Sequence, residues 1–460
     1  MIAAVVGGFA LRLAFGLLYW TGKPLTHDEQ EYLSLARSLT AGHGFVYDAA
    51  LESGTGAQFG RAPGYPVFLA AIGAGRRVFE TAPSRVKIVQ ALVGAAGVWV
   101  IGAWGRRSWG TSGGAIAAAI AAVYPPLVWM PAYVLSETLY SALALGAAYA
   151  LQLAVDSGAS TSGRWTRAGA AGLLMGAAVL VRPDMIFFVP LAAIWLILRR
   201  SYALAAAVVI ACLVVVAPWT IRNARLHGRL MLAAATGGVN FWTGNHPLAT
   251  GEGDLAANPA IKQADLEFRA AHPGLTAEAL EPIYYRESLR YIVGHPGWWV
   301  SLLARKSFYV AVPVGASYAL HSSRYRLAAV VSYLLLLPFT LAGLWRMPRN
   351  ARPTALFLLA GSAVLVCLVF FPQERYRTPV IDPALIVCAA GAVVRLRPCA
   401  CNRTFSSLFP PTTSATTCPS WFGRSWRAMD TVCSSSTTPH RTGRVRLPTI
   451  WRASIRAASM

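Results

Sequence analysis

The chain has 460 residues, of which 55% are hydrophobic and only 13% are charged, and its formal net charge is +22. So apolar a composition excludes a soluble globular protein, because one soluble core cannot bury that much hydrophobic surface. The positive charge does not indicate nucleic-acid binding, because the Arg residues punctuate apolar runs instead of clustering among polar neighbours. The seven Cys residues include no CxxC pair for zinc, and none lies in a predicted outward loop, so no disulfide framework is expected.

Apolar stretches near the length needed to cross about 30 Å of hydrocarbon recur along the chain. They predict an all-α polytopic membrane protein with about ten transmembrane helices. The first is interpreted as a retained helix and not a signal peptide, because Arg12 lies within it and no convincing cleavage site follows. The ten predicted spans are residues 2–20, 86–104, 112–130, 138–154, 168–181, 184–198, 203–219, 327–345, 354–371 and 379–395.

The short loops between these spans predict the orientation of the chain. With a cytoplasmic N-terminus, four loops place their Arg residues in the cytoplasm, as the positive-inside rule expects. Two further apolar pieces, residues 64–79 and 298–314, are predicted to lie as interfacial helices on the outer face. Counting either as a span would place the Arg pairs that follow it on the outer side of the membrane. The basic residues of the four loops are Arg106, Arg107, Arg164, Arg167, Arg199, Arg200, Arg346, Arg349 and Arg352.

This topology divides the chain into a membrane domain, residues 1–395, and a tail, residues 396–460. Two large outward segments interrupt the membrane domain, residues 21–85 and residues 220–320. The second is predicted to be an exterior loop or small cap without a core of its own. Ten Arg residues and a single acid occur from Arg395 onward, and this stretch is interpreted either as a disordered tail or as an out-of-frame translation.

The acidic residues are segregated by the same topology. Of the 19 Asp and Glu residues, only Asp156, Asp382 and Asp430 lie outside the outward segments, which leaves 16 on the outer side. Acidic residues contribute little to membrane orientation. The outer face is therefore the expected place for chemistry, although most of these carboxylates are expected to be solvated.

The stretch THDEQEYLSLARSLTAGHGF, residues 26–45, follows the first span and carries the leading candidates. Asp28, Glu29 and Glu31 open a short predicted helix. Carboxylates in a first turn are favoured by the helix dipole alone, so an ordinary helix start is the alternative interpretation.

Four more ionisable residues lie where predicted spans meet the outer surface. Arg61 precedes a rigid Pro-Gly-Tyr-Pro turn, where it is placed to meet a lipid phosphate or to act as a snorkelling anchor. Glu137 lies between the third and fourth spans, and Arg182 and Asp184 lie between the fifth and sixth. Ionisable groups at such depths tend to be functional, and a local ion pair is the alternative.

The stretch FPQERYRTPVIDPAL, residues 371–385, places charged residues at the outer mouth of the last span. Arg375 and Arg377 lie outside against the positive-inside trend, which suggests an anionic partner there. An ion-pair cluster with Glu374 that closes the bundle is the alternative. Tyr376 lies between the two arginines.

Taken in order, these motifs resemble those of the GT-C superfamily of integral-membrane glycosyltransferases. The likeness is carried by the acidic pair after the first span, then Y..LAR.L..G.GF, R.PGYP..LA, LSE, RP, GN.P and ERYR.P. It is strongest to the bacterial branch related to protein O-mannosyltransferases and aminoarabinose transferases, of glycosyltransferase family 39. It covers about residues 1–395 and leaves the tail outside.

The resemblance implies a GT-C-like fold and a polyprenyl-phosphate sugar donor. It also implies roles for individual residues: Asp28 as the catalytic base with Glu29 beside it, and Arg61 as a contact of the donor phosphate. Glu137 corresponds to an acidic residue that orients the acceptor or binds an ion. Further substrate-binding positions implied by the matching motifs are Tyr65, Arg182, Asp184, Asn245, Arg375, Tyr376 and Arg377.

The expected activity is therefore an inverting transfer of a hexosyl or pentosyl group to an acceptor hydroxyl of a protein, lipid or glycan. Cationic groups near the phosphate and a carboxylate near the acceptor suit this reaction. No nucleotide-binding motif is present, and no cofactor is predicted, since a metal is unsupported without a DxD motif. The expected location is the plasma (inner) membrane of a bacterium, with the site facing the exterior and with membrane lipids as partners.

Two other classes stay open at this point. A transporter or lipid flippase predicts ionisable residues in mid-membrane and an internal repeat, whereas only Arg12 and Asp382 lie within spans and no repeat is evident. A catalytically inactive assembly subunit would have the same fold without the chemistry.

Overall fold

Helices make up nearly all of the regular structure in the computed structural model, which describes residues 1–48, 60–156, 160–228, 231–234, 236–315 and 322–396. Residues Met1–Cys399 form one compact unit. Across the described ranges no strand occurs, and a single isolated bridge joins Pro24 to Thr81. The predicted all-helical class is confirmed, while both interpretations of the tail concern residues outside the described part from 397 onward.

Each of the ten predicted spans lies on a helix, and two of them share one bent helix. By length and apolar composition, five stretches of the described chain qualify as membrane spans: α1 with η1, α4, α6, α9 and α15. The protein is therefore an integral membrane protein. The helices that carry the spans are α1 (Ile2–Ala14), its π-helical continuation η1 (Phe15–Tyr19), α4 (Ser84–Val123), α6 (Glu137–Val155), α7 (Thr161–Val181), α8 (Phe188–Leu198), α9 (Tyr202–His227), α15 (Ser323–Trp345), α16 (Thr354–Val369) and α18 (Ile381–Leu396).

The bent helix, α4, reverses direction at Gly110. The φ of Gly110 is 75°, in the left-handed region that glycine adopts without steric cost. A Cβ added to Gly114 would lie 2.9 Å from the carbonyl oxygen of Gly102, although twelve residues of straight helix span about 18 Å. The chain therefore folds back on itself, as the separate predicted spans 86–104 and 112–130 require.

Close helix contacts hold the bundle together. α7 packs against α6 and α9, and α18 packs against α4 and α15. On α7, a Cβ added to Gly172 would collide with the carbonyl group of Val208, and one added to Gly176 would lie 2.7 Å from the carbonyl oxygen of Cys212. The two contacts join pairs of residues that have the same separation in sequence, so α7 and α9 run in the same direction. The fifth and seventh predicted spans are expected to do so, because successive spans alternate in direction.

The first outward segment contains α2 (His27–Thr40), α3 (Gly64–Ala71) and the short 3₁₀ helix η2 (Ala74–Arg76). A capping box starts α2: the Glu29 amide donates to the Thr26 hydroxyl, and the Thr26 amide donates to the Glu29 carboxylate at 2.8 Å. The start of the predicted helix at the acidic residues is therefore confirmed.

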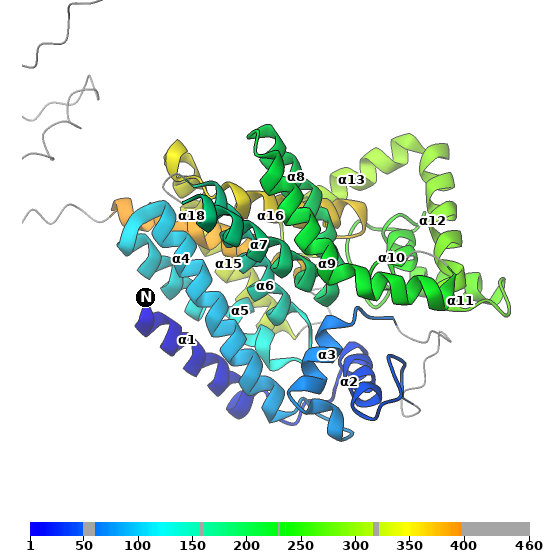
Figure 1. Ribbon diagram of the computed structural model, residues 1–460. Helices are drawn as coiled ribbons and strands as arrows, with labels where there is room; N and C mark the ends of the chain where they lie inside the picture. Colours follow the sequence, from blue (N-terminus) through cyan, green and yellow to red (C-terminus); the bar gives the residue numbers. More distant parts are fainter. Residues whose placement is uncertain (49–59, 157–159, 229–230, 235, 316–321, 397–460) are drawn as a thin grey trace, which may run out of the picture. The chain divides into compact units, whose positions relative to one another are not determined.

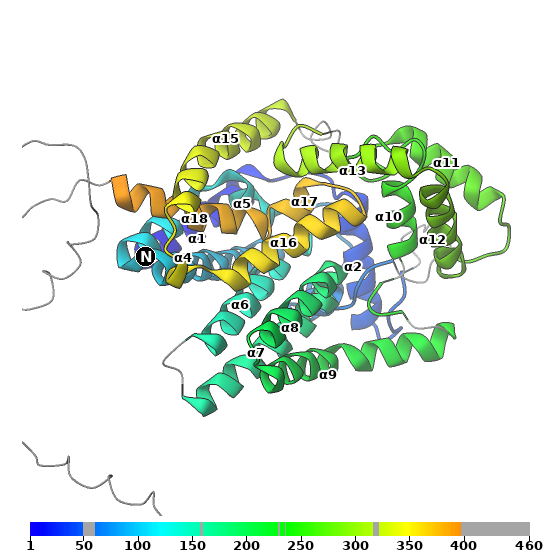
Figure 2. The ribbon, with the colours of Figure 1, turned by 90° about the horizontal axis from the view of Figure 1, so that it is seen from above.

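The second outward segment is larger than an exterior loop. Its helices are α10 (Gly237–Gly244), α11 (Pro259–Ala270), α12 (Ala277–Gly294) and α13 (Pro296–Ala311). They enclose a small apolar cluster of Trp242, Ala249, Ile261, Leu280, Tyr284 and Leu302. The helices thus form a small cap around an apolar cluster, a cluster that was not expected from the sequence. α2, α3 and α10 to α12 lie at the right of both views, away from the N-terminus (Figures 1 and 2).

The two ionisable residues that the sequence places within spans are both buried. Arg12 donates to the carbonyl oxygens of Gly8, Ala121 and Ala122 at 2.9, 3.0 and 3.2 Å, so its charge faces the carboxyl end of α4. Asp382 accepts a hydrogen bond from Tyr124. Both groups thus have local structural partners.

Candidate active site

Asp28 lies in the first turn of α2, where its carboxylate is held between two arginines. Oδ1 accepts from Nη2 of Arg61, and Oδ2 accepts from Nη1 of Arg375. Burial opposes ionisation of Asp28, but the two guanidinium groups outweigh it and hold the pKa of this carboxyl well below its usual range. Asp28 is therefore an anion with both oxygens engaged.

Arg61 extends the network away from Arg375. Its Nε donates to Oε2 of Glu31 at 2.7 Å, and its guanidinium carbon lies 5.3 Å from the centre of the Tyr32 ring. Oε1 of Glu31 accepts from the Tyr47 hydroxyl at 2.8 Å, and that hydroxyl accepts from the Gly60 amide at 2.7 Å. The last two contacts tie the chain just before Arg61 to α2.

Arg375, in the short helix α17 (Glu374–Arg377), extends the network in the other direction. Its Nε donates to Oε1 of Glu137 at 2.5 Å, and Nη1 of Arg182 donates to the same oxygen at 2.8 Å. Arg182 also donates from Nε to Asp184 at 3.0 Å. Glu137 starts α6, Arg182 follows the end of α7, and Asp184 lies in the 3₁₀ helix η4 (Pro183–Phe187), so helix ends position all three.

Opposite charges alternate along the whole network. Four carboxylates and three guanidiniums leave one excess negative charge. Exposure is greatest in its middle: the Asp28 and Arg375 side chains are 27% and 26% exposed, whereas that of Glu137 is 4% exposed. A substrate therefore has access near Asp28 and Arg375, and Glu137 is buried. The members, in order, are Glu31, Arg61, Asp28, Arg375, Glu137, Arg182 and Asp184.

Aromatic rings support the arginines of this network. The Tyr376 ring lies 5.2 Å from the guanidinium carbon of Arg182. Tyr65 is fully buried, donates to Oε1 of Gln90 at 2.9 Å and meets the Tyr32 ring edge to face. Tyr65 thus acts on Arg61 through Tyr32, and Tyr376 contacts Arg182 directly.

Besides the supporting residues Tyr65 and Tyr376, three of the predicted site residues lie outside the network. Both carboxylate oxygens of Glu29 accept backbone amides, from Thr26 and, at 2.8 Å, from Val134, so Glu29 joins α2 to the chain before α6. Asn245 donates to the Val369 carbonyl oxygen at 2.9 Å. Arg377 is paired with Asp382 at 3.0 Å.

Glu31 is the network member that sequence reasoning left out of the site. It lies three residues after Asp28, on the same side of α2, and this spacing is the signal that would have found it. Across the described ranges, no three His, Cys, Asp or Glu side chains are grouped so that they could hold a metal ion.

The fold matches that of an archaeal oligosaccharyltransferase. The apo oligosaccharyltransferase of Archaeoglobus fulgidus superposes with a TM-score of 0.51 at 14% identity, over 85% of this chain and 50% of that protein. The complex of the same enzyme, AglB, with an inhibitory peptide and a dolichol-phosphate gives 0.50 at 12% identity, over 85% and 50%. ArnT from Cupriavidus metallidurans bound to undecaprenyl phosphate gives 0.41 at 15% identity, over 86% and 77%.

The chain is thus a polytopic membrane protein with the GT-C fold. Within that class, residues 62–221 match the family of dolichyl-phosphate-mannose-protein mannosyltransferases, which confirms the GT-C resemblance read from the motifs. The chain spans about half of the length of the archaeal oligosaccharyltransferase. No curated protein matches the chain in sequence.

Proposed function

We propose that this protein is an inverting glycosyltransferase that takes its sugar from a polyprenyl-phosphate donor. The observation that carries the proposal is the Asp28 carboxylate held between Arg61 and Arg375 in the most exposed part of the network. We place the protein in the plasma membrane of a bacterium, with this site facing the exterior.

The two arginines suit the leaving group of such a reaction. Guanidinium groups bind phosphate oxygens through paired donors. Arg61 and Arg375 both donate to the carboxylate of Asp28, so their guanidinium groups converge on one anion. Negative charge develops on the phosphate as the bond from its oxygen to the anomeric carbon breaks, and the two cations stabilise that charge. The released product is the lipid phosphate.

Asp28 suits the role of base for the acceptor. A donor phosphate that takes hydrogen bonds from Arg61 and Arg375 frees the Asp28 oxygens and raises the pKa of Asp28, because its cationic neighbours are then shared. The carboxylate then takes the acceptor hydroxyl proton as the acceptor oxygen bonds to the anomeric carbon, opposite the departing phosphate. Donor binding thus prepares the base.

The comparisons support a lipid-phosphate donor. The matched family is named for dolichyl-phosphate-mannose, and one structural neighbour was solved with a dolichol-phosphate. Because the chain spans half of that neighbour, the inhibitory peptide bound there says nothing about the acceptor of this chain. The sugar and the acceptor are left to experiment.

The test measures transfer of label from a panel of radiolabelled polyprenyl-phosphate hexoses and pentoses in membranes that contain the full chain. We expect Asp28→Asn to lower turnover at least about 100-fold, as loss of a general base does, and Arg61→Ala to weaken donor binding as well. Asp48→Asn is the matched control, because Asp48 is paired with Arg37 in the same outward segment but outside the network. Full activity of Asp28→Asn would remove the central claim.

Wild-type protein that binds the donor without turnover would identify an inactive assembly subunit instead. Movement of the intact donor across the bilayer, without chemistry, would identify a flippase. Separating lipid-linked from transferred label shows whether turnover occurs, and the side of sealed vesicles on which the labelled lipid is accessible shows whether the donor has crossed the bilayer.

A further inference from the structure

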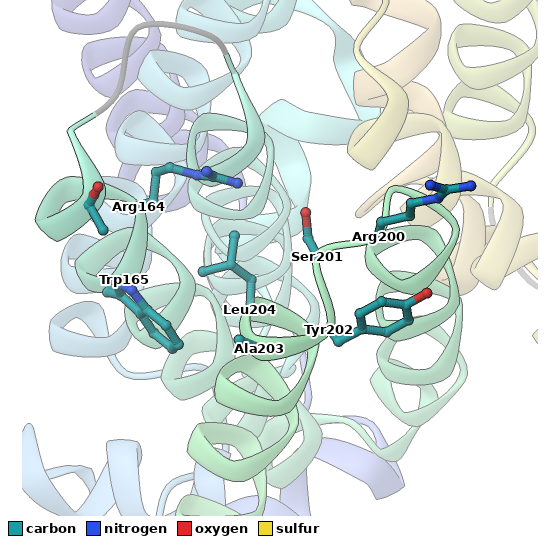
Figure 3. A pocket seen from close by; sticks show the side chains of 8 residues that line it. Arg164, Trp165, Arg200, Ser201, Tyr202, Ala203 and Leu204 are labelled. Atoms are coloured by element: carbon teal, nitrogen blue, oxygen red, sulfur yellow. The ribbon is translucent and has the colours of Figure 1, made fainter. Parts of the chain in front are cut away.

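A cavity lies at the other end of α7 from the Asp28 network. Its volume is about 420 Å³, and it opens between the start of α7 and the turn from α8 to α9 (Figure 3). Its lining residues are Thr161, Arg164, Trp165, Arg200, Ser201, Tyr202, Ala203 and Leu204.

The parallel packing of α7 and α9 creates this cavity. The glycine contacts at Gly172 and Gly176 bring the two helices together near their middles, and the same sequence offset places the first turn of α7 beside the α8–α9 turn. The amide of Arg200 donates to the Ile197 carbonyl oxygen and that of Ser201 to the Leu196 carbonyl oxygen, which is the Schellman end of a helix.

Arg200 occupies the position of this motif that glycine normally takes. Its φ is 55°, and it has the only positive φ of a non-glycine residue within the described ranges. Glycine would fit this turn with less strain. A charged side chain thus occupies a position where the backbone favours glycine.

The arginines of this cavity differ from those of the Asp28 network in their partners. In the described part of the chain, neither Arg164 nor Arg200 has a carboxylate within ion-pair distance. The Nε of Arg164 donates to the Ala154 carbonyl oxygen at 3.2 Å. In Figure 3 the Arg164 guanidinium extends toward Ser201, whereas Arg200 lies on the far side of the turn with its guanidinium directed away from both. Positive charge and a hydroxyl therefore border an open space.

The surroundings of the cavity match the headgroup level of a bilayer. Trp165 is 46% exposed and Tyr202 is 63% exposed, and such rings favour the interface between water and lipid. Exposed apolar side chains continue along the same helices, at Leu173 on α7 and Ile210 on α9, where acyl chains would lie.

We propose that this cavity binds the headgroup of an anionic glycerophospholipid. Basic pockets between transmembrane helices recognise such headgroups through their phosphate oxygens. Arg164 and Ser201 donate to the phosphate, Arg200 lies at the rim, and the acyl chains follow α7 and α9. The site does not depend on the proposed transferase activity.

Native mass spectrometry of the purified full chain tests this site, with dioleoylphosphatidylglycerol and dioleoylphosphatidylcholine as probes. We expect wild type to prefer the anionic lipid. Arg164→Gln and Arg200→Gly should each lower its affinity about fivefold, since one basic residue near an anionic lipid surface contributes about 1 kcal/mol. Arg346→Gln is the matched control, an exposed arginine of another loop with the same predicted orientation, and should leave the affinity unchanged.

Arg200→Gly separates lipid binding from folding. Glycine suits the left-handed turn, so this variant should melt no lower than wild type while it loses lipid. Unchanged affinity in both variants, or equal binding of the two lipids by wild type, would overturn the proposal. Inorganic phosphate at millimolar concentration should displace little lipid; complete displacement would assign the site to a free anion.

Discussion

Nη1 of Arg375 donates to Oδ2 of Asp28, although 347 residues separate the two in sequence. The contact joins the first outward segment to the mouth of the last span. The same guanidinium donates from Nε to Glu137. Arg375 therefore helps to keep Asp28 ionised and joins Asp28 to Glu137.

Replacement of Arg375 should change how activity depends on pH. Arg375→Ala removes one of the two cations that hold the pKa of Asp28 below its usual range, so this pKa should rise. A base must be ionised, so the acidic limb of the kcat/KM profile should move to higher pH, and kcat/KM at neutral pH should fall about 100-fold. Arg375→Lys should recover part of the loss. An acidic limb unchanged in Arg375→Ala would contradict the coupling.

Glu137→Gln should lower stability more than most single substitutions. The Glu137 side chain is 4% exposed and accepts from Arg182 and Arg375, so its loss of charge leaves two guanidiniums short of a counter-ion. Breaking a buried pair in this way costs about 3 kcal/mol. Thermal unfolding in detergent measures the cost. Asp156→Asn, at the less buried pair with Arg107, serves as the control and should shift the melting temperature less.

Glu29→Gln should separate a structural carboxylate from a catalytic one. Glu29 closes the capping box of α2 and accepts the Val134 amide, so its replacement should cost about 1 kcal/mol of stability. Turnover per folded molecule should stay within about twofold of wild type, in contrast to Asp28→Asn. A loss of turnover equal to that of Asp28→Asn would return Glu29 to the catalytic set.

Glu374 should make stability depend on pH near neutrality. Burial raises the pKa of Glu374 to about 7, with Arg377 opposing and Asp382 reinforcing the shift. A carboxyl whose pKa is higher in the folded state holds its proton more tightly there, so its contribution to stability is lost as pH rises from about 4.5 to about 7. Glu374→Gln should therefore gain up to about 3 kcal/mol relative to wild type at pH 8 and little at pH 4. Equal effects at both pH values would contradict this assignment.

Local signals explain which features the sequence predicts. The start of α2 follows from Thr26 and the acidic residues after it, and the spans follow from apolar length. The same Thr26-x-x-Glu29 spacing is a capping-box signature, and it would have assigned Glu29 a structural role from sequence alone. Glu31 could likewise have been predicted as a site residue from its helical spacing to Asp28.

Tertiary contacts explain what the sequence does not predict. The shared Oε1 of Glu137 depends on how the end of α7 and the chain after α16 converge on the start of α6. Asn245 lies in the GN.P motif, which led us to predict a substrate contact. Its side chain instead joins α10 to the end of α16. No periodicity or spacing within one segment encodes either arrangement.

The unequal number of carboxylates and guanidiniums has a consequence for donor entry. The resting network carries one excess negative charge, and a lipid phosphate adds at least one more in the same place. Proton uptake by a carboxylate of the network relieves that repulsion, so donor binding and protonation should be linked, with affinity rising as the pH outside the membrane falls. With the proposed donor and the proposed outward orientation of the site, the acidity of the external medium would then regulate how much of the protein is loaded with donor.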